Sequence, residues 1–219
     1  MHVHTDWFLT PERAAVHLPT GTAVVADLHL GYDQVRCRSG EAVPAFSLDD
    51  TIAGLSAVVA RSQVRRLLIA GDLFEDGRCH ALAADLLGWL AGTGVELAGL
   101  IPGNHDRDLA PGDAPLPVWP KGFKLGRWRV VHGDGKLPRG SVVHGHEHPC
   151  LRWERRRSAP CYLVGSRRII LPAFSEDAAG VNVLGDRRWR SFRCLVPAGE
   201  RVLDFGEVGT LARRVIGRP

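Results

Sequence analysis

The chain has 219 residues, of which 45% are hydrophobic and 24% are charged. This composition is typical of a soluble globular protein and excludes collagen, coiled coils and intrinsically disordered chains. The most apolar stretch, residues 81–101, contains Asp85, Glu96 and several glycines, so it is a poor membrane span, and no signal peptide is predicted. The five cysteines form no CxxC pair and are expected to be free thiols in a reducing, cytoplasmic compartment.

Charge is distributed unevenly along the chain. Residues 1–120 contain 8 Lys and Arg against 15 Asp and Glu, whereas residues 121–219 contain 20 against 9. A basic second half can bind an anionic partner such as nucleic acid. Because 25 of the 28 basic residues are Arg, an arginine-rich composition without such a role explains the same pattern.

Apolar strands alternate with helices in the first half of the chain. Strands are predicted at residues 22–26, 67–70 and 97–101. A helix is predicted to begin near Ser47, because Ser47 followed by Asp50 resembles a capping box. The helix is expected to present Ile52, Leu55 and Val58 on one face. A second helix is predicted at residues 81–90. This alternation indicates an α/β fold.

The second half has a different pattern. Residues 109–120 contain four prolines and are expected to form a loop. Short strands are predicted after it, at residues 129–131, 141–143, 150–153, 161–164, 168–171 and 189–195. Since no linker separates the halves, these strands are expected to form a second sheet within one domain that spans residues 1–219.

Potential metal ligands follow the apolar runs directly. They lie in the segments Asp27-Leu28-His29, Gly71-Asp72, Gly103-Asn104-His105-Asp106, Val131-His132-Gly133-Asp134 and His144-Gly145-His146-Glu147-His148. Loops beyond the carboxyl ends of strands line the ligand crevice in layered α/β folds, so these segments are expected to converge. Carboxylates, imidazoles and an amide suit Mn²⁺, Fe or Zn²⁺. Each segment alone is also typical of a turn, a helix cap or an exposed strand, but chance explains the ordered set poorly.

The series ADLHLG, GDLFED, GNHD, VVHGD and GHEHP, within residues 26–149, resembles the signature of the calcineurin-like metallophosphoesterases. The resemblance implies a four-layer αββα sandwich. The segments PERAAVHLP, CLRW and APCYLVGSRRIILPAF are further similar to the bacterial ligase-associated DNA-repair phosphoesterases and their archaeal relatives. The chain departs from that branch at Tyr32, where a lysine is expected, and at SEDAAG, where a glycine-rich turn is usual.

The resemblance implies two divalent metal ions, with Mn²⁺ expected and Fe or Zn²⁺ as alternatives. One ion would be held by Asp27, His29, Asp72 and His148. The other would be held by Asp72, Asn104, His132 and His146, so that Asp72 bridges them. His144 is expected to be structural, and Asp106 and Asp134 are expected to orient His105 and His132.

The implied reaction is hydrolysis of a phosphodiester by a hydroxide shared between the metals, with His105 assisting the leaving group and Asp106 as its catalytic partner. The expected substrate is DNA in repair, and the resemblance adds a repair ligase or helicase as partner. A candidate DNA-binding cluster comprises Trp153 and Arg152, Arg155, Arg156, Arg157, Arg167 and Arg168, although a solvated hairpin fits the same residues. The alternatives are hydrolysis of a small nucleotide or of a pyrophosphate-linked lipid precursor, and a non-catalytic metal-bound interaction module.

Overall fold

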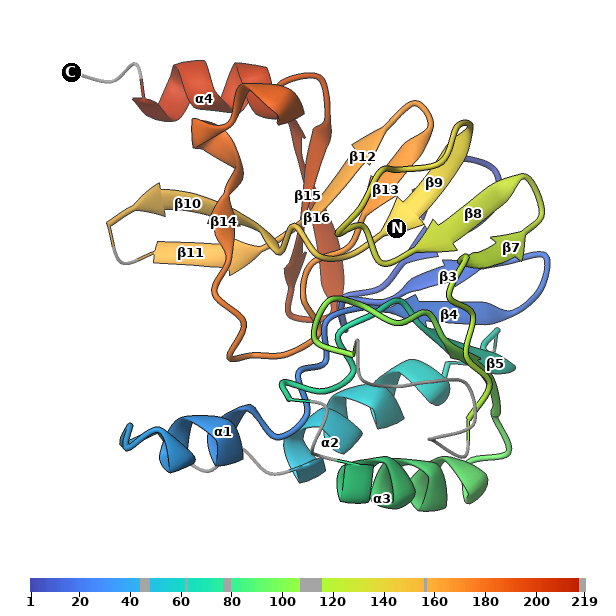
Figure 1. Ribbon diagram of the computed structural model, residues 1–219. Coiled ribbons are helices and arrows are strands. Elements are labelled where there is room, and N and C mark those ends of the chain that lie inside the picture. The colour runs from blue at the N-terminus through green and yellow to red at the C-terminus, as the bar shows by residue number, and fades with distance from the viewer. Residues whose placement is uncertain (44–47, 62, 77–79, 107–115, 156, 217–219) are drawn as a thin grey trace.

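Two large β-sheets lie face to face in the computed structural model, which describes residues 1–43, 48–61, 63–76, 80–106, 116–155 and 157–216 (Figure 1). The first sheet has the strand order β1-β2-β3-β4-β5-β6. Its strands are β1 (His2–Val3), β2 (Trp7–Leu9), β3 (Ala15–His17), β4 (Thr22–Val25), β5 (Arg66–Ile69) and β6 (Glu96–Leu100). Strands β4, β5 and β6 are parallel neighbours, whereas β1 to β4 pair antiparallel.

The second sheet is built by the later part of the chain, in the order β16-β15-β12-β13-β9-β8-β7. Its strands are β7 (Phe123–Leu125), β8 (Trp128–Val131), β9 (Ser141–His144), β12 (Tyr162–Gly165), β13 (Arg168–Ile170), β15 (Arg193–Ala198) and β16 (Arg201–Glu207). Strands β8, β9 and β13 run parallel. A small third sheet, β11-β10-β14, contains β10 (Pro149–Glu154), β11 (Arg157–Pro160) and β14 (Val181–Asn182).

Helices cover the outer faces of the two large sheets (Figure 1). Helices α2 (Leu48–Val59) and α3 (His80–Ala91) pack on the first sheet. Helix α4 (Val208–Ile216) and the short 3₁₀ helices η1 (Val183–Gly185) and η2 (Arg187–Trp189) pack on the second. Helix α1 (Tyr32–Arg38) follows β4 and buries none of its residues. The α/β class and the predicted four-layer αββα sandwich are confirmed.

Alternation along the parallel strands divides the core into layers. In β4, Ala23 and Val25 belong to the apolar cluster beneath α2 and α3, whereas Val24 belongs to the cluster between the two sheets. Successive side chains of a strand point to opposite faces, so such a strand is apolar on both sides. Trp7 of the first sheet and Trp128 of the second meet edge to face between the sheets, with ring centroids 5.9 Å apart.

Some sequence predictions differ from the structure. Trp189 ends η2 instead of opening a strand, because the Asp186 carboxylate accepts the N–H of Arg188 and starts a 3₁₀ turn; β15 begins at Arg193. Ser47, residues 109–115, Cys79 and Arg156 lie outside the described residues. The cysteines at 37, 150, 161 and 194 are free. Among the described residues, no helix is long and apolar enough to span a membrane.

Candidate metal centre

The first sheet brings candidate ligands to one edge. Asp27 lies just beyond β4, Asp72 just beyond β5, and Asn104 beyond β6. Because these strands are parallel neighbours, their carboxyl ends meet at the same edge of the sheet. Backbone hydrogen bonds join the turns: the Asp27 N–H donates to the Gly71 carbonyl (3.0 Å), and the His29 N–H donates to the Asp72 carbonyl (2.9 Å).

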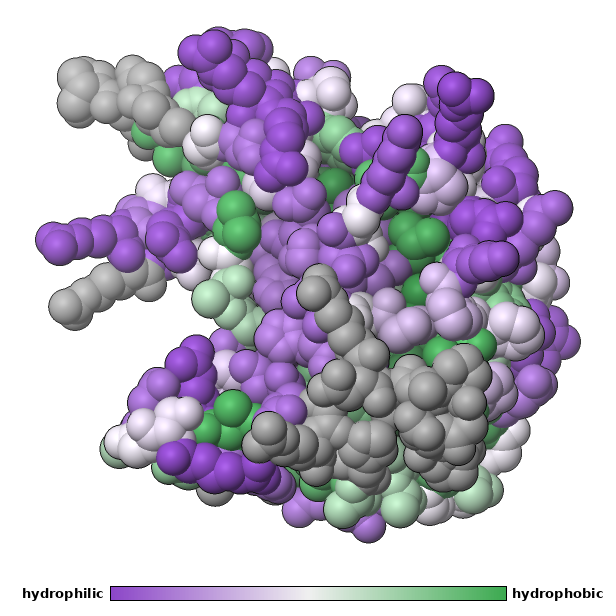
Figure 2. Space-filling view, viewed as in Figure 1, coloured by the Kyte–Doolittle hydropathy of each residue, from purple (hydrophilic) through white to green (hydrophobic). Residues whose placement is uncertain are grey.

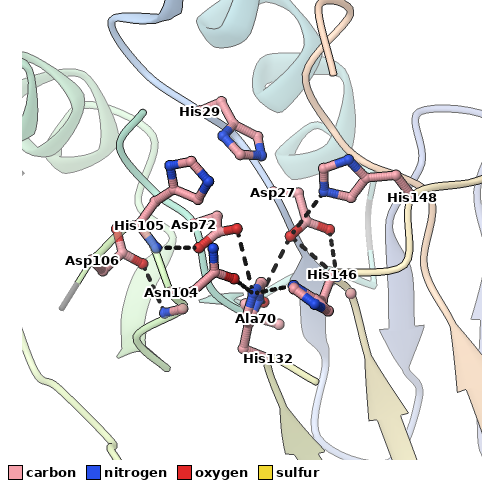
Figure 3. A network of polar contacts seen from close by, with 12 residues as sticks. Asp27, His29, Ala70, Asp72, Asn104, His105, Asp106, His132, His146 and His148 are labelled. Atoms are coloured by element: carbon pink, nitrogen blue, oxygen red, sulfur yellow. Dashed lines mark hydrogen bonds and ion pairs between the residues drawn. The ribbon is translucent and has the colours of Figure 1, made fainter. Parts of the chain in front are cut away.

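The second sheet contributes imidazoles to the same place. His132 follows β8, while His146 and His148 follow β9, its parallel neighbour. The His146 N–H donates to both carboxylate oxygens of Asp27, at 2.9 and 3.2 Å, so a hydrogen bond connects the two sheets at the site. Figure 3 shows the rings gathered around the carboxylates of Asp27 and Asp72.

All seven predicted ligands are brought together. Two sets of donor atoms are formed, and within each set the atoms lie within 4.8 Å of one another. Asp27, His29 and His148 form one set, and Asp72, His132 and His146 form the other. A third set joins His29 and Asp72 with His105. The Asn104 Oδ1 lies 3.2 Å from His132 Nε2, beside the second set. Ligation by these residues remains a prediction, and their arrangement matches it.

Two buried imidazole nitrogens at the site form no hydrogen bond among the described residues, and one of them, His148 Nε2, lies 3.6 Å from Asp27 Oδ1. The Nε2 atoms of His29 and His148 form no hydrogen bond within the described part of the chain. The other ring nitrogen of His29, Nδ1, lies 2.8 Å from the Glu75 carboxylate. This contact places the proton on Nδ1 and leaves the Nε2 lone pair directed into the site. Buried nitrogens without a hydrogen bond are costly in a folded protein, so these residues fit a bound metal ion.

The electrostatics of the site favour positive charge. Burial raises the pKa of Asp72, but its hydrogen bond to His132 and the charge of that ring lower it to about 2. Burial lowers the pKa of His132, but Asp72 and the charge of Asp27 raise it to about 9. The two buried carboxylates therefore stabilise a cation between the sheets, which is the condition for binding a divalent metal.

The backbone at the site is strained. Five of the seven non-glycine residues with positive φ in the described chain are candidate ligands: Asp27 (59°), His29 (48°), Asp72 (47°), His146 (65°) and His148 (41°). Left-handed conformations of such residues cluster at functional sites, where surrounding structure holds them in place. Glycines provide the close approaches: a Cβ on Gly71 would overlap the His132 ring, and one on Gly103 would overlap the Asp72 carboxylate.

His105 lies at the edge of the metal site, and its side chain is 36% exposed. The backbone N–H of His105 donates to Asp72 Oδ1 (3.0 Å), which fixes the residue against the candidate bridging ligand. Its Nδ1 lies 2.8 Å from the Glu75 carbonyl oxygen and 3.9 Å from the Glu75 carboxylate. Glu75 therefore contacts both His29 and His105, a role that the sequence pattern did not predict. Its position three residues after Asp72, within GDLFED, was the available signal.

The expected contact between Asp106 and His105 is not formed. The Asp106 carboxylate is fully buried and accepts hydrogen bonds from the N–H groups of Leu73 (3.2 Å), Phe74 (3.2 Å) and Gly103 (3.0 Å). Burial raises the pKa of Asp106 against the effect of these bonds. Asp106 thus holds the turn after β5 to the turn after β6, and it faces away from the imidazole in Figure 3.

Two further expectations concern histidines of the second sheet. Asp134 is exposed, and the Nδ1 of His132 instead lies 3.1 Å from the Ala70 carbonyl, so Asp134 does not orient His132. His144 is buried behind the site, and burial lowers its pKa to about 4. His144 belongs to none of the three donor sets, in keeping with the expected structural role.

Comparisons with known proteins agree with this geometry. The family model described as calcineurin-like phosphoesterase matches residues 21–163. The solved structure of the Pseudomonas putida nuclease MPE is similar, with a TM-score of 0.71 and 24% sequence identity; the match covers 91% of this chain and 94% of that one. A search of the curated proteins found no match. The chain therefore belongs to the calcineurin-like phosphoesterase family and is a metal-dependent phosphoesterase.

Proposed function

We propose that the protein is a two-metal phosphodiesterase that cleaves DNA. The position of Asp72 carries this proposal. Asp72 shares one donor set with His29 and another with His132 and His146, and its Oδ2 lies 3.4 Å from His132 Nε2. A carboxylate that lies near a candidate ligand of each ion, His29 on one side and His132 on the other, is suited to bridge two cations that would otherwise repel each other.

The donor chemistry supports two divalent ions. Asp27, His29, Asp72 and His148 would hold one ion, and Asp72, Asn104, His132 and His146 would hold the other. Mixed oxygen and nitrogen donors without cysteine suit Mn²⁺, Fe or Zn²⁺. The family resemblance favours Mn²⁺ among these. When bound, such ions supply Lewis acidity and lower the pKa of water. Because only two ligand carboxylates offset four positive charges, the site retains attraction for an anionic ester.

His105 is the candidate acid for the leaving group. With Nδ1–H donating to the Glu75 carbonyl, the Nε2 atom is free to hold a proton for the departing oxygen. The partly exposed position of His105, in one donor set with His29 and Asp72, puts this proton at the edge of the metal site. This arrangement supports hydrolysis without a covalent enzyme intermediate.

A nucleic-acid substrate is supported from outside the site. The structural neighbour is described as a nuclease. The segments PERAAVHLP, CLRW and APCYLVGSRRIILPAF resemble ligase-associated DNA-repair phosphoesterases. This resemblance extends the proposal to a cytoplasmic role in DNA repair beside a ligase or helicase. Co-purification with such a partner from the source cells would test that extension separately from the chemistry.

The test of the proposed function is an activity screen on metal-stripped protein reconstituted with Mn²⁺, Fe²⁺ or Zn²⁺. The substrates are bis(p-nitrophenyl) phosphate, p-nitrophenyl phosphate, single- and double-stranded DNA, a small nucleotide and a pyrophosphate-linked lipid. We expect metal-dependent cleavage of the diester and of DNA, and its loss in Asp72→Ala. Cleavage confined to the nucleotide or lipid would replace the DNA assignment. Retained metal without turnover of any substrate would indicate a binding module.

A further inference from the structure

Two hollows of opposite charge adjoin the candidate metal centre. One, of about 700 Å³, includes His29 in its wall and is called the His29 cavity. The other, of about 560 Å³, includes His132 and is called the His132 groove. In Figure 2 the molecule is also hollowed at the left, between the β10–β11 hairpin and α1, and α1 residues form part of the wall of the His29 cavity.

The His132 groove is basic. Four cationic side chains line it, against the single carboxylate of Asp134: Lys121, Arg129, Lys136 and Arg139. Three of the four are exposed, and none is paired with a carboxylate in the described part of the chain. Arg129 donates to the Lys121 carbonyl (3.0 Å), which positions this side of the groove. Unpaired cations beside a phosphoesterase site are available to bind further phosphates.

The His29 cavity has the opposite character. Its lining carries the carboxylates of Glu12, Asp33, Asp50, Glu176 and Asp177. The single Arg in its lining, Arg13, already pairs with Glu176 (2.7 Å) and donates to backbone carbonyls at residues 174 and 175. Burial and then the charges of Asp33, Glu176 and Asp50 raise the pKa of Asp177, which reports a negative potential. Its apolar lining includes Leu30 and Phe174, so a phosphate is disfavoured there.

The arginines singled out in the sequence do not form one surface. Arg152 lies on β10 and Arg157 on β11, and Arg157 pairs with Glu154 at 3.3 Å. Arg168 begins β13, which runs parallel to β9, so it lies at the opposite edge of the sheet from the metal site. The β10–β11 hairpin projects from the side of the molecule (Figure 1). These arginines are less well placed than the groove to bind phosphates next to the metals.

We propose that a nucleic-acid strand binds with the phosphates on one side of the scissile diester in the His132 groove, while a nucleoside without phosphate contacts lies over the His29 cavity. The recognition of phosphate is thus one-sided. This inference rests on the proposed function, because it assumes a polyanionic substrate. It assigns the specificity for that substrate to Lys121, Arg129, Lys136 and Arg139.

Paired charge-removal variants test the location. Lys136→Ser/Arg139→Ser removes two charges from the groove, and Arg155→Ser/Arg157→Ser removes two from the hairpin. For a single-stranded oligonucleotide, the groove variant should show a raised KM and a salt dependence flatter by roughly 0.7 for each phosphate that it no longer binds. Its kcat/KM ratio of oligonucleotide to bis(p-nitrophenyl) phosphate should fall. The hairpin variant should behave as the wild type. The reverse pattern would overturn the inference.

Neutral phosphates test the one-sidedness. Two oligonucleotides carry uncharged methylphosphonates on one side or on the other side of a single cleavable diester. We expect only one of them to bind more weakly, and this difference should vanish in the groove variant. Equal effects from both would contradict the inference. If the groove variant loses activity on both the small diester and the oligonucleotide, Lys121→Ser replaces it as the test. Wild-type protein that cleaves the small diester but neither binds nor cleaves any oligonucleotide would instead refute the nuclease function.

Discussion

The two sheets make unequal contributions to the candidate centre. The first sheet supplies both candidate ligand carboxylates, Asp27 and Asp72, together with one imidazole and one amide. The second sheet supplies three imidazoles and no carboxylate. The first sheet therefore determines how much positive charge the site attracts, and the second completes the set of donors. Neither sheet alone can form the centre, so its integrity depends on how the sheets pack together.

The largest expected effect is that of Asp72→Ala. Removing the shared carboxylate should release both metals and reduce hydrolysis to background, because the negative charge between the two cations no longer offsets their repulsion. The second-sheet variant His146→Ala and the amide variant Asn104→Ala should each mainly weaken one ion. Elemental analysis of the purified proteins measures this difference. Two metals retained in the Asp72 variant would show that it is not a bridge.

His105→Ala separates metal binding from proton transfer. The variant should keep its metals but lose roughly 10²–10⁴-fold in turnover of DNA, the usual contribution of a positioned acid. The loss should be smaller for nitrophenyl esters, whose leaving group needs little protonation. Steady-state rates on substrates with graded leaving groups measure this dependence. An equal loss across the series would mean that His105 is not the acid.

Glu75→Gln should have an intermediate effect. Partners of metal-binding imidazoles typically contribute 10- to 100-fold in affinity or activity. The Glu75 carboxylate lies 2.8 Å from His29 Nδ1 and 3.9 Å from His105 Nδ1. We expect about this loss in metal affinity, measured by titration of the stripped protein, with part of it restored in Glu75→Asp. An Asp106→Asn variant is the matched comparison. It should lower the free energy of unfolding and leave the leaving-group dependence of the rate as in the wild type. A changed leaving-group dependence with unchanged stability would return Asp106 to the catalytic role.

Tyr162→Phe tests the packing between the sheets and should have the smallest effect on activity. The Tyr162 hydroxyl of the second sheet lies 2.7 Å from the Thr10 carbonyl and 3.1 Å from the Ala14 carbonyl, in the connection between β2 and β3 of the first. Losing this buried donor should lower the free energy of unfolding by about 1–3 kcal/mol. Denaturant titration measures the change, while metal content and specific activity stay near wild type. A loss of metal would show that this hydrogen bond also aligns the ligands.

The ligands could be predicted because each follows an apolar strand, and the parallel order of neighbouring strands collects strand ends at one edge. The partner of His105 could not be predicted in the same way. Asp106 is adjacent to His105 in sequence, but the turn directs its carboxylate towards three backbone N–H groups. Glu75 is thirty residues away in sequence and reaches His105 only because the ends of β5 and β6 lie side by side.

Short elements could not be predicted for a different reason. Strands β1, β2 and β3 have two or three residues each, too few for a period of two to be recognised, and their pairing along the first sheet stabilises them.

The arginine cluster is close together in sequence but not in space. The chain folds Arg152 and Arg168 onto different sheets, and the groove cations come from separate loops and from β8.

The left-handed backbone at five candidate ligands creates a conflict between durability and catalysis. An L-residue in this region costs about 1–2 kcal/mol that glycine avoids, so glycine at Asp27 or Asp72 would relieve the backbone while removing a donor. Such a glycine would also lose the hydrogen bonds that these carboxylates accept from His146 and His105, so the relief of strain is offset and the metal centre is lost. Selection that retains phosphoester cleavage must find its stabilising changes elsewhere, in the helices and the apolar layers.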